Sequence, residues 1–219
     1  MFKDRSDAGR HLAEKLAHYR GQNAVVLALP RGGVVAGREI AQALGLPLDI
    51  AVVRKIGHPL SPEYAIGAVD DTGAIILNDA ETESVSQAWL SDDIEREKKE
   101  AERRVKAYRG GRKPIPILGK TALIVDDGIA TGLTMRLVVR SLRAQHTAGC
   151  GGTCRRPARI VVAVPVASAE AVESLRKEAD EVITLEPPEE FLGAVGAHYL
   201  EFAQVEDAEV IMLLSLGIP

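Results

Sequence analysis

Residues 123–134 read Leu-Ile-Val-Asp-Asp-Gly-Ile-Ala-Thr-Gly-Leu-Thr and place two carboxylates between an apolar run and a loop of small residues. The apolar run predicts a buried strand, and the loop opens into a segment that predicts a helix. The two glycines allow backbone torsions and close approaches that a Cβ would block. Thr131 supplies a hydroxyl, and the first turn of a helix presents unpaired N–H groups that bind a phosphate. Because Asp126 and Asp127 would repel a lone phosphate, their presence favours a ligand that also carries hydroxyls or a metal.

Two other interpretations account for part of this segment. In the first, the aspartates only cap a helix and the glycines make a turn, which does not explain two acids directly after four apolar residues. In the second, the strand end belongs to a phosphoacceptor receiver domain, which keeps an acceptor aspartate but does not need the small-residue loop. We therefore favour a phosphate-binding loop.

The same alternation of strand and helix extends along the chain. Short apolar runs predict strands at 24–29, 48–53, 122–125, 160–164 and 182–185. Helical spacing predicts a first helix capped by Ser6 or Asp7 and running to about Tyr19, and further helices at 34–44, 131–144 and 169–177. This order predicts an α/β fold with an open, mostly parallel, doubly wound sheet of about five strands and helices on both faces. Ligands of such sheets bind beyond the carboxyl ends of the strands.

Three additions are expected around this sheet. Residues 65–69 and 74–77 flank Asp-Asp-Thr-Gly and predict a β-hairpin. The stretch 92–109 holds 13 charged residues in 18 and predicts a solvated helix within a helical insertion at 78–118. The segment 187–219 predicts a small cap over the site. Because no repeat or low-complexity linker is present, we expect a single domain over residues 1–219.

Composition and charge exclude several classes of protein. The chain has 27 Lys and Arg against 31 Asp and Glu, a formal net charge of −4, which argues against a nucleic-acid coat. Its apolar runs are far shorter than the roughly 20 residues that span a bilayer, so no membrane association is expected. The polar amino terminus and two cysteines, too few for a disulfide framework, predict a cytoplasmic protein.

Residues 123–134 resemble the phosphoribosyl-pyrophosphate binding motif of type I phosphoribosyltransferases, which specifies most of its positions. Residues 29–33, Leu-Pro-Arg-Gly-Gly, resemble the pyrophosphate-binding turn of that family. Residues 53–57 and 62–67 are similar to the basic segment and the following mobile loop of adenine-type members. The resemblance covers roughly residues 24–185 in order, with the charged helix as an addition.

The resemblance implies a role for each residue of these motifs. Asp126 and Asp127 would hold the 2- and 3-hydroxyls of a ribose, directly or through Mg²⁺. The 5-phosphate would lie in a loop formed by Gly128, Ile129, Ala130, Thr131 and Gly132. The pyrophosphate would meet a turn formed by Arg31, Gly32 and Gly33, where family members often hold a non-proline cis peptide.

Residues after the second strand would complete the site. Arg54 and Lys55 would bring positive charge to the leaving pyrophosphate. Glu63 lies in a setting similar to that of a glutamate near the base in adenine-type members, and an exposed loop acid is an equally good interpretation. At Ala130 the hypoxanthine-guanine members have an aspartate that faces the purine, so the chain is closer to adenine- and uracil-type members.

The histidines and cysteines offer weaker signals. His146, Cys150 and Cys154 have no fourth zinc ligand nearby, and their segment predicts a surface insertion with free thiols. His58 predicts an exposed loop histidine, and His198, near two aromatic residues, predicts a packed residue of the cap.

The leading hypothesis is a magnesium-dependent phosphoribosyltransferase of nucleotide salvage. It would transfer the 5-phosphoribosyl group from phosphoribosyl pyrophosphate to a nitrogen of a small base-like acceptor and release pyrophosphate. One alternative is a non-catalytic regulator that senses phosphoribosyl pyrophosphate or a nucleotide on the same fold. A phosphoribosyl-pyrophosphate synthetase is a third candidate, for which the sequence offers no ATP site. The resemblance also implies a homodimer.

Overall fold

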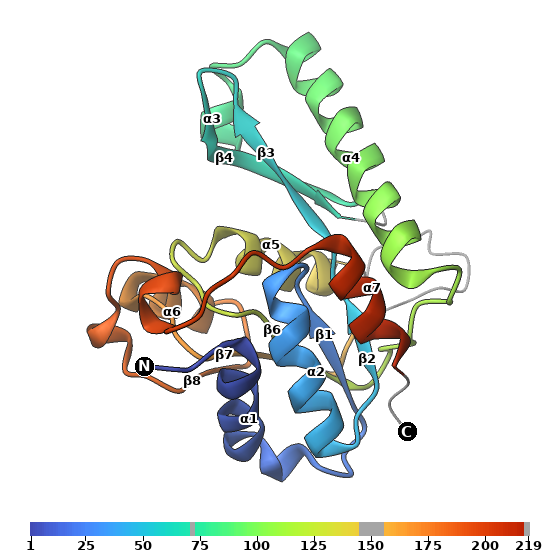
Figure 1. The fold of residues 1–219 in the computed structure, drawn as a ribbon. Coiled ribbons are helices and arrows are strands. Elements are labelled where there is room, and N and C mark those ends of the chain that lie inside the picture. Colours follow the sequence, from blue (N-terminus) through green and yellow to red (C-terminus); the bar gives the residue numbers. More distant parts are fainter. Residues whose placement is uncertain (71–72, 145–155, 217–219) are drawn as a thin grey trace.

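The central sheet of the computed structural model has five parallel strands in the order β2-β1-β6-β7-β8 (Figure 1). The structure describes residues 1–70, 73–144 and 156–216. The strands are β1 (Ala24–Ala28), β2 (Leu48–Ile50), β6 (Thr121–Val125), β7 (Arg159–Val164) and β8 (Glu181–Thr184). The predicted α/β fold with an open parallel sheet is confirmed.

Helices cover both faces of this sheet. One face packs against α1 (Arg5–Lys15) and α2 (Gly32–Leu44), and the other against α5 (Leu133–Ala144) and α6 (Ala169–Arg176). On the central strand β6, Leu123 faces α1 and α2 whereas Ile124 faces α5 and α6, and both are fully buried. Strands buried on both faces read as continuous apolar runs, which is why the sequence pattern identified them.

The direction of winding reverses between β1 and β6. The chain passes from β1 through α2 to β2 on one side, and from β6 through α5 to β7 on the other. The two strands pair in parallel with Ala28 beside Val125. The loops that follow them, residues 29–33 and 126–132, therefore meet at the switch point where ligands of doubly wound sheets bind.

The structure corrects two boundaries near the first helix and the second strand. The cap of α1 is Asp4, whose Oδ1 accepts a hydrogen bond from the Asp7 backbone N at 2.8 Å, and not Ser6 or Asp7. A short 3₁₀ helix (Ala17–Tyr19) follows α1. The strand expected at 48–53 ends at Ile50, because the chain then leaves the sheet and begins a second one.

The second sheet forms what we call the upper lobe, residues 53–109, which stands above the five-stranded body in Figure 1. It comprises the antiparallel strands β3 (Val53–His58), β4 (Ser61–Asp70) and β5 (Ile75–Leu77) with the helices α3 (Asp79–Thr82) and α4 (Gln87–Arg109). The predicted hairpin is present as β4 and β5.

The segment expected to be a mobile loop is also part of this lobe. Residues 62–67 lie within β4, which pairs with β3, so their backbone forms a strand where an open loop was expected. The side chains of Ile56 and Ile66 are fully buried against Leu90 of α4, which stabilises a hairpin where the sequence indicated a loop. The charged helix α4 buries one face, which includes Leu90, Ala101 and Tyr108, and exposes charged residues on the other.

The C-terminal segment returns to the body and forms the predicted cap. It contains the 3₁₀ helices η2 (Pro188–Glu190) and η3 (Val195–His198) and ends in α7 (Asp207–Ser215), which packs against both α2 and α4. Phe2 pairs with Tyr199, so the amino terminus lies beside this cap. Within the ranges the structure describes, no helix is long and apolar enough to cross a membrane.

Candidate functional site

The two loops at the switch point touch each other through glycines. A Cβ added to Gly32 would lie 1.9 Å from Oδ2 of Asp127, and one added to Gly33 would lie 2.8 Å from the Cα of Asp126. Only a residue without a Cβ allows this approach. The peptide bond between Pro30 and Arg31 in this turn is cis. The structure therefore brings the predicted glycine turn and the predicted acid pair into direct contact.

The two aspartates have different surroundings. The Asp127 side chain accepts a hydrogen bond from Nε of Arg5 at 2.6 Å, and its backbone carbonyl accepts one from the Tyr199 hydroxyl at 2.5 Å. Its backbone N donates to Oδ1 of Asp126 at 2.9 Å. No residue in the described ranges forms an ion pair with Asp126. Burial, with the neighbouring Asp127 carboxylate, raises the pKa of Asp126 well above its usual range, although part of its surface stays accessible.

Sequence reasoning missed Arg5 and the role of Tyr199. Arg5 is 122 residues away from Asp127 in the chain, and nothing in the local pattern of an exposed-looking helix start indicates the contact. Burial raises the pKa of the Tyr199 hydroxyl, which keeps it protonated as a donor. The aromatic residues near Tyr199 were the only sequence feature that bore on its role, and they predicted a packed cap rather than a hydrogen bond to Asp127.

The loop of residues 128–132 is held by contacts with Val195 of the cap and with Ser168. A Cβ on Gly128 would lie 2.5 Å from Cγ1 of Val195, and Gly132 has a φ of +75°. The Ser168 hydroxyl donates to the Ala130 carbonyl at 2.6 Å. Ala130 and Thr131 are exposed, directly before the start of α5. The loop thus presents backbone and hydroxyl groups to a ligand at a helix N-terminus, as a phosphate site requires.

Two of the predicted basic residues already have acidic neighbours. Nη1 of Arg31 lies 3.6 Å from Oε2 of Glu206 and 3.8 Å from Oδ1 of Asp207, at the start of α7. Nε of Arg54, on β3, donates to Oε2 of Glu97 on α4 at 2.8 Å. No local pattern indicated these acids, because they come from separate elements.

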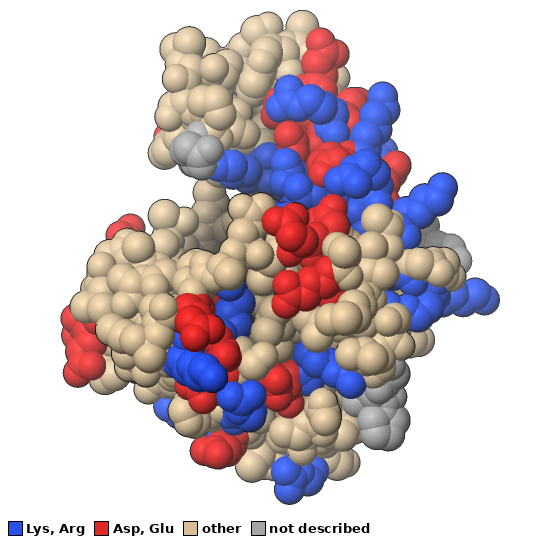
Figure 2. Space-filling view, in the orientation of Figure 1, with Lys and Arg blue, Asp and Glu red and all other residues tan. Residues whose placement is uncertain are grey.

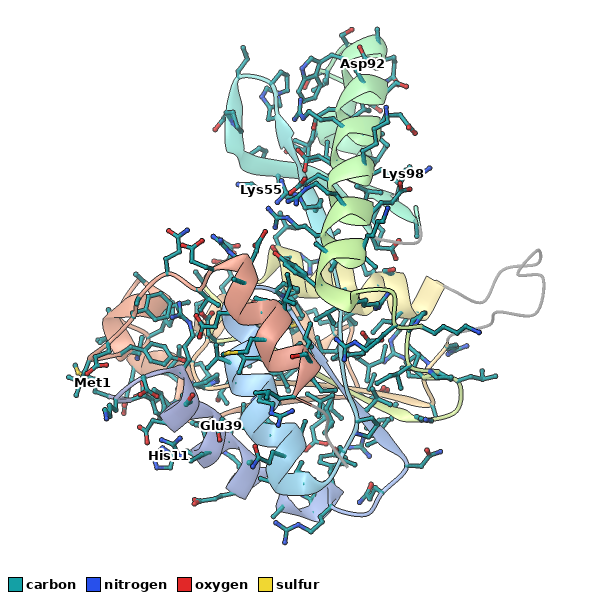
Figure 3. The ribbon with its side chains drawn as sticks, turned by 45° about the vertical axis from the view of Figure 1, so that its right-hand side comes forward. Met1, His11, Glu39, Lys55, Asp92 and Lys98 are labelled. Carbon is teal, nitrogen blue, oxygen red and sulfur yellow. The ribbon has the colours of Figure 1, made fainter. Side chains whose placement is uncertain are left out.

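Lys55 lies on the opposite face of β3 from Arg54, since successive side chains of a strand alternate. In Figure 3 it is found at the lower edge of the upper lobe, above the body. Figure 2 shows a hollow between lobe and body, with basic side chains on the lobe above it and acidic side chains on the body beside it.

The remaining predicted residues are scattered. Glu63 falls within β4 near the turn of the β3–β4 hairpin, so its backbone belongs to a strand and not to a loop. His58 is partly buried at the end of β3, where Nδ1 accepts from the Leu60 backbone N at 3.2 Å. His198 is buried, as predicted, with Nδ1 2.5 Å from Oε2 of Glu186. The cluster of His146, Cys150 and Cys154 lies outside the described residues.

A metal ion at this site would need ligand atoms from a bound substrate in addition to the protein carboxylates. In the part of the chain that the structure describes, no group of three or more His, Cys, Asp or Glu is placed to hold a metal ion. Mg²⁺ is commonly held by one or two carboxylates together with substrate phosphates and water. Asp126 and Asp127 therefore fit a magnesium ion that arrives with an anionic ligand.

Comparisons with known proteins cover almost the whole chain. Residues 3–201 match the family model of the phosphoribosyl transferase domain. The chain is 43% identical over 216 residues to "Putative phosphoribosyl transferase Rv0571c" of Mycobacterium tuberculosis strain H37Rv, an alignment that covers 98% of the chain and 46% of that relative. The chain thus spans about half the length of the curated relatives it matches. The crystal structure of TT1426 from Thermus thermophilus has a TM-score of 0.81 and 41% identity, covering 98% of this chain and 97% of that one.

Proposed function

The chain belongs to the phosphoribosyl transferase domain family, and we propose that it transfers a 5-phosphoribosyl group from phosphoribosyl pyrophosphate to a nitrogen of a nucleobase-like acceptor. The observation that carries the proposal is the contact of the Gly32–Gly33 turn with Asp126 and Asp127 at the switch point. In the reaction, the bond from C1 to the pyrophosphate oxygen breaks and its electron pair leaves with pyrophosphate. The lone pair of the acceptor nitrogen forms the new bond to C1.

The residues after β6 bind the phosphoribosyl half. Asp126 accepts hydrogen bonds from the ribose hydroxyls. Burial raises its pKa, and a magnesium ion held beside it would favour its charged form, whose negative charge favours the cationic character that C1 gains as the bond breaks. The backbone N–H groups of residues 128–132 and the Thr131 hydroxyl bind the 5-phosphate at the start of α5.

The residues after β1 and on β3 bind the leaving group. Backbone N–H groups at Gly32 and Gly33 lie at the start of α2, where an anion is favoured. Arg31, Arg54 and Lys55 supply positive charge. Pyrophosphate carries more negative charge than a single carboxylate, so we expect it to draw Arg31 and Arg54 away from their present acidic partners.

Magnesium fits the acid pair, and when bound it would neutralise negative charge between the ribose hydroxyls and the pyrophosphate. Asp126 and Asp127 are the residues that would hold it, directly or through water, so that Asp127 can keep its ion pair with Arg5. For the acceptor, Glu63 is proposed to orient or remove the proton of the incoming base. Ala130, which carries no carboxylate, leaves the adenine- and uracil-type acceptors as the first candidates.

A screen for pyrophosphate release tests the proposal. Purines, pyrimidines and small amines are incubated with the protein, magnesium and phosphoribosyl pyrophosphate, and at least one acceptor is expected to release pyrophosphate. The double variant Asp126→Asn/Asp127→Asn should lose turnover while keeping its circular dichroism spectrum. Asp92→Asn, an exposed acid at the far end of the lobe (Figure 3), is the matched control and should keep the parent rate.

Two results would contradict the assignment. Release at the parent rate by the double variant would exclude the acid pair from the reaction. Calorimetric binding of phosphoribosyl pyrophosphate without release for any acceptor would instead favour the regulator. Incubation with ATP and ribose 5-phosphate is expected to yield no phosphoribosyl pyrophosphate.

A further inference from the structure

We infer that Arg5 is a positioning residue that separates the roles of the two aspartates: by holding Asp127, it leaves Asp126 as the carboxylate that meets the ribose hydroxyls. The inference rests on the proposed function, and it adds a residue from α1, far from either motif in the chain.

Arg5 is itself held on several sides. Its Nε donates to Oδ2 of Asp127 at 2.6 Å, and its Nη1 donates to the Ala203 carbonyl at 2.6 Å. Its guanidinium carbon lies 3.7 Å from the centroid of the Phe202 ring. Only 11% of the Arg5 side chain is exposed. A planar guanidinium with these contacts presents Nε in one direction, toward Asp127.

Asp127 is held at its side chain and along its backbone. Arg5 binds the carboxylate, Tyr199 donates to the carbonyl, and the Asp127 N–H donates to Asp126. Gly32 lies against Oδ2 on a further side. Turning this carboxylate toward a ligand would break the ion pair with Arg5, whereas Asp126 has no cation to give up among the described residues.

Charge gives a second argument. Two adjacent carboxylates oppose the approach of a ligand that carries a phosphate and a pyrophosphate. The positive charge of Arg5 cancels that of Asp127 at contact distance. The site then presents the single carboxylate of Asp126 beside the phosphate loop, which removes much of the repulsion that the sequence alone implied.

Binding measurements test the inference without relying on transfer. Arg5→Met is compared with Arg10→Met, a matched control on the same helix whose side chain is 53% exposed and pairs with Asp7 and Glu39. Calorimetry with magnesium gives the Kd for ribose 5-phosphate and for inorganic phosphate. We expect Arg5→Met to weaken ribose 5-phosphate binding by about tenfold or more, the scale of one charge-assisted hydrogen bond. Inorganic phosphate should weaken less, because it loses only the charge compensation of Asp127 and has no ribose hydroxyls to misplace.

A double-mutant cycle shows whether Arg5 acts through Asp127. In the Asp127→Asn background, Arg5→Met is expected to add little, and Asp126→Asn should weaken ribose 5-phosphate binding more than Asp127→Asn does. Arg5→Lys, which keeps the charge without the fixed Nε geometry, should lie between Arg5→Met and the parent, and it replaces Arg5→Met if that variant does not fold.

Four results would overturn the inference: additive effects in the cycle, equal weakening of phosphate binding, tighter binding by Arg5→Met, or a larger loss for Asp127→Asn than for Asp126→Asn. Each of these leaves the proposed function in place if the parent binds ribose 5-phosphate. A parent protein that does not bind ribose 5-phosphate would overturn both.

Discussion

The body and the upper lobe both border the hollow seen in Figure 2, and each places charged groups beside it by a different structural means. In the body, the parallel strands are buried on both faces, and the site is made by the backbone that leaves β1 and β6, packed so closely that Gly32 tolerates no Cβ. In the lobe, three antiparallel strands have one face against α4, and Arg54 and Lys55 are placed by strand alternation. Side chains, unlike backbone, can change partners when a ligand arrives.

The two regions also differ in how they are stabilised. The lobe has its own small core around Ile56 and Leu90, separate from the two large clusters of the body. Their junction contains a buried ion pair, in which Nε of Arg109 lies 3.0 Å from Oδ1 of Asp49. A buried ion pair adds little net stability to the fold, but removing one partner destabilises the fold strongly because the other charge is left buried and unpaired. We therefore expect the lobe to open at lower free energy than the body.

The largest expected effect is a loss of unfolding free energy that differs between the core of the body and the core of the lobe. Leu123→Ala, in the central strand, should lower the free energy of unfolding by about 3–5 kcal/mol, since it leaves a cavity where both neighbouring strands are fixed. Ile56→Ala should cost about 2–3 kcal/mol and increase hydrogen exchange mainly in the lobe. Urea unfolding and amide exchange measure both. Equal loss of protection throughout the body in Ile56→Ala would show one cooperative unit.

The next effect concerns ligand binding in the body. Gly32→Ala should lower the affinity for ribose 5-phosphate by about tenfold or more, because the new methyl group displaces the Asp127 carboxylate and the turn. Calorimetry measures the affinity, and an unchanged circular dichroism spectrum serves as the control for folding. Parent-like affinity would mean that the two loops separate freely.

A smaller effect tests the ion pair that joins β3 to α4. Arg54→Gln should lower the free energy of unfolding by about 1 kcal/mol, because the pair with Glu97 is mostly shielded from water. The control is Arg103→Gln, whose partner Glu100 lies one turn away on the same exposed helix surface and whose loss should cost clearly less than that of Arg54. Similar losses for the two variants would mean that Arg54 does not anchor β3.

The smallest effect is a pH dependence in the lobe. Hydrogen bonds from Arg103 and Arg104 lower the pKa of Glu100 to about 2. A carboxylate with a lowered pKa in the folded state stabilises the fold above its usual pKa, and this contribution is lost as pH falls from about 4.5 to about 2. Solvent screening keeps it below about 1 kcal/mol. The difference in unfolding free energy between the parent and Glu100→Gln should shrink over this range.

The body offers a counterpart to this measurement. Burial alone would raise the pKa of Glu178, but hydrogen bonds from Arg140 and Arg136 outweigh it and lower the pKa. Its contribution has the same sign and is also lost on acidification. The ion pairs of Glu178 with Arg136 and Arg140 join α5 to the turn before β8. Glu178→Gln should therefore lower the free energy of unfolding at neutral pH more than Glu100→Gln does. If the unfolding free energy of either variant differed from that of the parent by the same amount at pH 7 and at pH 2, the lowered pKa of that glutamate would be contradicted.

Much of the fold and part of the site could be predicted from local pattern. Residues 123–134 indicated a buried strand, an acid pair and a loop opening into a helix, and β6 and α5 lie there. Continuous apolar runs identified the strands of the body because those strands are buried on both faces. The lobe was harder, because a half-buried antiparallel sheet leaves only a weak alternation, and residues 62–67 of β4 were interpreted as a loop.

Local sequence is enough to predict the order of strands and helices, the glycine turn, the acid pair and the family, since each depends on residues adjacent in the chain. Three contacts follow instead from the packing of the folded chain: Arg5 binds the Asp127 carboxylate, Tyr199 donates to the Asp127 carbonyl, and Glu97 pairs with Arg54. These contacts join segments far apart in the chain, and their formation depends on how helices and sheets pack rather than on any local pattern. The physical difference between Asp126 and Asp127, identical and adjacent in the sequence, exists only once α1 and the cap are folded around them.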